Sequence, residues 1–137
     1  MNEIDYFQST PYWMDFVDLS MAVFLYEICN DNQFTCVSGS DFINFLNLKP
    51  TSQPVSIRLK EKLRICYMVL SVSLAIKPAD RGRQWAAEFL KICGIPMSYY
   101  IKHRNDVCNE DTTNNNKLYR KAIDEAIDNA KKLNIGT

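Results

Sequence analysis

The sequence predicts an all-α domain that folds as a single compact bundle of five or six helices. Apolar residues recur at the three- and four-residue spacing of helices through most of the chain. Only four glycines and five prolines occur, which is sparse for a domain that would need many turns between strands. The 137 residues, 47% of them hydrophobic and 23% charged, suit one globular domain with a real core.

Two helices are expected in the first third of the chain. Thr10 and Pro11 form a good helix start, because a hydroxyl can cap the helix and proline at its first position loses no needed hydrogen bond. Apolar residues follow at helical spacing to about residue 30. Ser38 or Ser40 can cap a second and shorter helix, which Pro50 brings to an end.

A long third helix is expected from about Val55 to Ile76. Its apolar residues fall near a heptad seam made of Val55, Leu59, Leu63, Cys66, Leu70 and Leu74. The first half is strongly basic and the second half is nearly uncharged, so one end should be exposed and the other buried. The uncharged run at 65–76 has 12 residues, which is well short of the roughly 20 needed to span a bilayer.

Two further helices are expected on either side of Gly94. Asp80 can cap the fourth helix, and Gly94 can end it, because glycine adopts the left-handed conformation without strain. Pro96 then takes the first position of the fifth helix. The residues expected to face inward are Trp85, Phe89, Ile92 and Cys93 on the fourth helix and Met97, Tyr100 and Ile101 on the fifth.

The chain divides into a helical core domain at residues 1–108, a polar linker at 109–116 and a C-terminal amphipathic helix at 117–137. The linker contains no apolar residue and many turn-forming ones. The last helix carries apolar residues at 4-3-4-3 spacing, namely Tyr119, Ile123, Ala126, Ala130 and Leu133. Two heptads are too few for a stable free helix, so this helix must dock on its own domain or on a partner.

Charge is segregated along the chain although the net charge is zero. Residues 1–48 hold seven acids and no Lys or Arg, whereas residues 49–104 hold eleven bases and three acids. Residues 105–137 are nearly balanced, with six acids and five bases. This pattern indicates either a basic face for a polyanion or internal pairing of the acidic third with the basic third.

The sequence shows no recognisable catalytic or metal-binding pattern. Its five cysteines include no CxxC pair, and its only histidine, His103, has no further metal ligands clustered around it. Phosphate-binding glycine motifs and the GxSxG motif are missing. We therefore expect a protein that is not an enzyme and that needs no cofactor. The free cysteines and the acidic start of the chain favour a cytoplasmic location.

The segment Trp85–Arg104 resembles a helix-turn-helix motif. Gly94 would lie in the turn, and Ile95 would pin the two helices together. The positions that the motif buries are filled by Phe89, Cys93 and Tyr100. The resemblance implies a recognition helix that begins at Pro96. The motif usually has alanine four residues before its turn glycine, where this chain has Leu90.

The sequence therefore favours a small accessory or regulatory protein that contacts double-stranded DNA. The candidate contacts on the fifth helix are Ser98, Tyr99, Lys102, His103 and Arg104. The candidate backbone contacts elsewhere in the basic third are Arg58, Lys62, Arg64, Arg81 and Arg83. Specific reading of bases would be poor, because no Arg, Asn or Gln occupies the first turn of the fifth helix.

A protein interaction module without enzymatic activity, or a homodimer, is the alternative function. In that case the C-terminal helix would bind a second copy or another protein through its apolar face. The two functions are compatible, since many helix-turn-helix proteins bind DNA as dimers. The same helix could instead complete its own bundle and bind nothing.

Overall fold

The computed structural model describes residues 15–135, and this part of the chain is all-α, as the sequence predicts. Six α-helices and one short 3₁₀ helix occur there, together with two isolated β-bridges and no β-strand. The elements are α2 (Leu19–Cys29), α3 (Gly39–Leu46), α4 (Lys62–Ala75), α5 (Ala79–Cys93), α6 (Met97–His103), the 3₁₀ helix η2 (Asp106–Cys108) and α7 (Asn114–Ile135).

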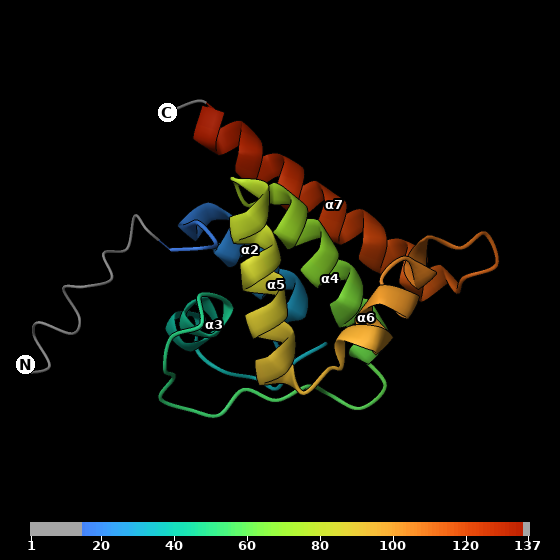
Figure 1. The fold of residues 1–137 in the computed structure, drawn as a ribbon, viewed down its shortest axis with the longest axis horizontal. Coiled ribbons are helices and arrows are strands. Elements are labelled where there is room, and N and C mark those ends of the chain that lie inside the picture. The colour runs from blue at the N-terminus through green and yellow to red at the C-terminus, as the bar shows by residue number, and fades with distance from the viewer. Residues whose placement is uncertain (1–14, 136–137) are drawn as a thin grey trace, which may run out of the picture.

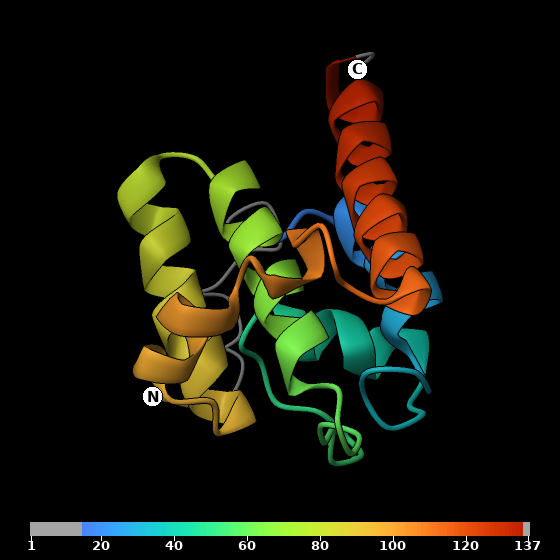
Figure 2. The same ribbon diagram turned by 90° about the vertical axis from the view of Figure 1, so that its right-hand side faces the viewer.

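Helix α4 stands at the centre of the bundle (Figures 1 and 2). It packs against α5 on one side and against α7 on the other. Helix α2 packs against both α7 and α3, and α6 lies against α4 beyond the end of α5. None of the helices in the described part of the chain is long and apolar enough to cross a membrane.

Aromatic rings from three distant segments form the centre of the core. The rings of Trp85 and Phe89 on α5 stack with their centroids 5.0 Å apart, and Phe89 lies 5.0 Å from Phe45 on α3. Phe34, in the loop after α2, meets Phe45 edge to face at 5.3 Å. The indole N–H of Trp85 donates to the carbonyl of Leu46 at 2.7 Å. Truncating any one of these buried rings to alanine typically costs about 3–5 kcal/mol.

The long third helix predicted from Val55 is wrong in its first part, because α4 begins only at Lys62. A turn at Leu59 and Lys60 precedes α4, and residues 56–58 before it pair with the loop after α2. The N–H of Thr35 donates to the carbonyl of Ser56, and the N–H of Arg58 donates to the carbonyl of Gln33, both at 2.9 Å. The helical spacing of apolar residues cannot reveal this pairing, since the partner lies more than twenty positions away in the sequence.

The sequence predicts the start of α3 correctly and the starts of α2 and α5 incorrectly. Ser38 caps α3 as expected, with its hydroxyl accepting from the N–H of Asp41. Asp80 is not the cap of α5, because α5 begins at Ala79 and Asp80 lies in its first turn. Thr10 and Pro11 lie outside the described residues. Residues 15–18 are not helical, so α2 begins at Leu19, where the Asp18 carboxylate accepts from the N–H of Met21.

Helices α4 and α5 approach closely at Gly82. A Cβ atom on Gly82 would lie 2.2 Å from the backbone oxygen of Ser73 on α4. The Ser73 hydroxyl also donates to the carbonyl of Gly82 at 3.0 Å, which reinforces the crossing. The position therefore requires glycine for space, although it is the fourth residue of helix α5.

We expect Gly82→Ala to destabilise the protein by about 1–3 kcal/mol, because the added methyl group forces two packed backbones apart. Urea unfolding measures the change. Gly39→Ala is the matched control, because a Cβ there meets only the ring of Tyr26 at 4.0 Å. The close crossing would be contradicted if both variants were as stable as the parent protein.

Candidate nucleic-acid interface

The turn at Gly94 has the geometry that the sequence predicts. Gly94 ends α5 in the left-handed conformation, with φ of 70°. Its N–H donates to the carbonyl of Lys91 at 3.1 Å, and the N–H of Ile95 donates to that of Leu90 at 2.9 Å. These two bonds satisfy carbonyls at the end of α5. Pro96 immediately precedes α6 and is not its first helical residue.

Helix α6 lies on the surface and buries mainly one residue, Tyr100, which is 4% exposed. Ser98 and Lys102 are exposed one turn apart on its outer side. Tyr99, His103 and Arg104 are half-buried along its flanks. The outward orientation that the helix-turn-helix resemblance requires of Ser98 and Lys102 is thus present.

The packing of α6 differs from that of a tightly crossed helix pair. Helix α6 contacts α4. The ammonium of Lys62, at the start of α4, lies 5.1 Å from the centre of the Tyr99 ring, and that ring lies 4.4 Å from the ring of His103. Leu90 is buried where the motif prefers alanine, and the close approach of α5 is made to α4 at Gly82.

Three cations therefore gather around α6, and we refer to Lys62, Lys102 and Arg104 as the α6 cations. Within the described part of the chain none of them forms an ion pair with a carboxylate. The guanidinium of Arg104 lies 5.3 Å from the centre of the Tyr100 ring. His103 is different, because its Nδ1 lies 2.6 Å from a carboxylate oxygen of Asp106.

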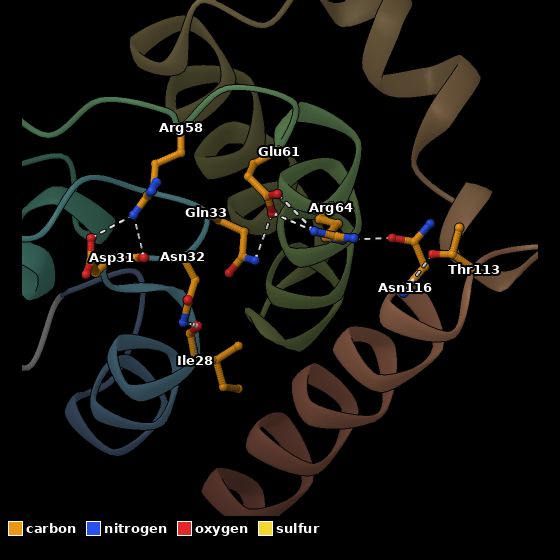
Figure 3. Close-up of polar contacts among 9 residues, drawn as sticks. All are labelled: Ile28, Asp31, Asn32, Gln33, Arg58, Glu61, Arg64, Thr113 and Asn116. Carbon is orange, nitrogen blue, oxygen red and sulfur yellow. Dashed lines mark hydrogen bonds and ion pairs between the residues drawn. The ribbon is translucent and has the colours of Figure 1, made fainter.

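Two predicted phosphate contacts, Arg58 and Arg64, are held by other parts of the chain (Figure 3). Arg58 donates to both the carboxylate and the backbone carbonyl of Asp31, each at 2.7 Å. Arg64 donates to the carboxylate of Glu61 at 2.9 and 3.0 Å and to the side chain of Asn116 at 2.7 Å. Each guanidinium is thereby paired with a carboxylate of the same chain, at the surface for Arg58 and in a half-buried position for Arg64.

The two remaining candidates, Arg81 and Arg83, lie at the opposite end of α5 from Gly94. A rise of 1.5 Å per residue separates Arg81 from Gly94 by roughly 20 Å. Arg81 packs over the ring of Phe16, with its guanidinium 4.3 Å from the ring centre, whereas Arg83 is exposed. The ten candidate residues consequently do not form one surface. The structure brings Lys62 together with the five candidates on and just after α6.

The apolar face of the C-terminal helix is used within the chain. Helix α7 packs on α2 and α4, and it begins at Asn114, inside the segment expected to be a linker. Four of the five heptad residues, Tyr119, Ile123, Ala126 and Ala130, are buried in the core. Leu133 is the exception, at 51% exposed.

Several residues predicted to face inward are on the surface. Ile92, Met97 and Ile101 are 55%, 44% and 58% exposed, and they flank the Gly94 turn. Leu59 and Leu74, from the expected heptad seam, are also exposed. Sequence reasoning missed this apolar surface, because spacing indicates that residues share a face but not whether another element covers that face.

Three of the five cysteines are poor nucleophiles. Burial raises the pKa of the Cys29 and Cys93 thiols to about 12 and that of Cys66 to about 11. In residues 15–135 no group of three or more His, Cys, Asp or Glu side chains is placed to hold a metal ion. Comparison of the chain with protein-family models, curated proteins and solved structures finds no match.

We expect Cys36, which is exposed, to react quickly with Ellman's reagent at pH 8, while the buried Cys29 and Cys66 react only on unfolding. A thiol with a pKa of about 12 has a thiolate fraction on the order of one in ten thousand at that pH. Absorbance of the released thiolate follows the reaction, and Cys36→Ser should reduce the fast phase by one thiol. Fast reaction of Cys29 or Cys66 in the native protein would contradict the burial of these two thiols.

Proposed function

We propose that this protein is a small accessory protein that binds DNA through the exposed side of α6. The observation that carries this proposal is the position of Lys62 over Tyr99, because it adds a cation from α4 to Lys102 and Arg104. Ser98 and Tyr99 supply hydroxyl groups on the same short helix. This arrangement supports contact with phosphate groups, which depends on cations and neutral donors that share a surface.

The composition of this surface favours weak binding without sequence preference. Each phosphate contact contributes about −0.9 to the slope of log affinity against log salt, so the three α6 cations predict a slope of about −3. Side chains suited to bidentate reading of bases are missing from the first turn of α6, which consists of Met97, Ser98 and Tyr99. Binding should therefore depend on charge and shape more than on base sequence.

We expect the double variant Lys102→Ala and Arg104→Ala to bind DNA more weakly than the parent protein. The slope of log affinity against log salt should change from about −3 to about −1, because two of the three contacts that release counterions are lost. Fluorescence anisotropy of a labelled 20-base-pair duplex between 25 and 200 mM salt measures both quantities. Circular dichroism verifies that the variant remains folded.

Arg83→Ala is the matched control for this experiment, because Arg83 is an exposed cation at the far end of α5. It should leave the affinity and the slope unchanged. Equal losses in Arg83→Ala and in the double variant would mean that charge alone matters and that α6 is not the contact surface. An unchanged affinity in the double variant would also refute the proposal.

A further inference from the structure

A second candidate binding feature lies where the extended segment before α4 passes the end of α5. A cavity of about 170 Å³ opens there, which we name the corner pocket. Its lining consists of Phe45, Val55, Ser56, Ile57, Ile92 and Cys93. A cavity of roughly 150 Å³ is known to hold one benzene molecule, so the corner pocket has room for one medium-sized apolar group.

The corner pocket is bordered by a backbone edge that the fold leaves open. Ile57 is paired antiparallel with Phe34, and the bonds that make this pair belong to their neighbours, Thr35 with Ser56 and Arg58 with Gln33. In such a pair the N–H and C=O of Ile57 point away from the partner segment. No hydrogen bond to these two groups occurs in the described part of the chain. An edge of this kind can accept an additional extended strand.

The charge beside this edge is positive. Lys60, three residues after Ile57, is exposed and forms no ion pair within residues 15–135. Leu59, next to Lys60 in the chain, is 88% exposed, and Ile92 in the pocket lining is 55% exposed, so apolar surface is available both beside this charge and at the pocket. A bound segment with both aliphatic and acidic side chains would therefore complement this surface. A second copy of the chain is disfavoured at this edge, because it would bring another Lys60 to the same place.

We propose that the corner pocket binds a short extended segment of a partner protein, rich in aliphatic and acidic residues. One aliphatic side chain of the segment enters the cavity between Ile57 and Cys93. The backbone of the segment pairs with the open N–H and C=O of Ile57, and an acidic residue of the segment faces Lys60. Addition of a strand in this way combines backbone hydrogen bonds for affinity with a side-chain pocket for specificity. None of these residues belongs to the α6 cations, so the inference stands independently of DNA binding.

The test is a titration of the full chain, labelled with ¹⁵N, with the capped peptide acetyl-Glu-Val-Leu-Val-Glu-amide. We expect saturable shifts of the amide signals of Val55, Ser56, Ile57 and Cys93. Two further versions of the peptide carry N-methyl groups on alternate residues, so that each version lacks a different set of backbone N–H groups. One version should lose affinity by about tenfold, because only one of the two sets of N–H groups faces Ile57. The other should bind like the parent peptide.

Charge variants complete the test. Lys60→Glu should weaken binding of the acidic peptide and strengthen binding of its analogue with lysine in place of glutamate, whereas Lys131→Glu on α7 should change neither. The proposal is overturned if the four amides do not shift, if both N-methylated probes bind like the parent, or if acidic and basic probes bind equally well. If the same amide signals shift when the protein concentration rises in the absence of peptide, the pocket binds a second copy of the chain, and the proposal is also overturned.

Discussion

The carboxylate of Glu61 is the contact on which the arrangement of the described chain most depends. It accepts from the side-chain amide of Gln33 at 2.9 Å and from the guanidinium of Arg64, and Arg64 in turn reaches Asn116 at the start of α7. The loop after α2, the beginning of α4 and the beginning of α7 are therefore linked through the Glu61–Arg64 pair (Figure 3). Because Glu61 immediately precedes α4, this contact holds the point at which the extended segment becomes helix.

The same contact limits the surface available for binding. Arg64, one of the candidate phosphate contacts, forms an ion pair with Glu61. Arg58 and Lys49 are paired with Asp31 and Asp15 from the acidic first third. The internal pairing of the acidic third with the basic third is thus realised in part. Several cations pair internally, whereas Lys62, Lys102 and Arg104 form no ion pair in residues 15–135 and can attract a polyanion only as a small group.

Local chemistry could be predicted from the sequence, and long-range pairing could not. The cap at Ser38 and the glycine stop at Gly94 follow from conformations that those residues favour by themselves. The pairing of Ser56 with Thr35 depends on segments far apart in the chain. The separation of Arg81 from α6, in contrast, follows from the length of α5 alone. For the site, the outward position of Lys102 was predictable from helical spacing around buried Tyr100. The contact of Lys62 with Tyr99 was not, because it joins two helices whose relative position no local pattern indicates.

The most direct measurement of the central contact is a double-mutant cycle between Glu61 and Arg64, followed by urea unfolding. The side chains are 15% and 25% exposed, so solvent screens the pair only partly. The structure predicts that Glu61→Ala and Arg64→Ala are each destabilising and that their coupling free energy is about 1–2 kcal/mol. A coupling free energy of zero would contradict this account, because it would show that the ion pair does not organise this part of the chain. Arg64 would then again be a candidate phosphate contact.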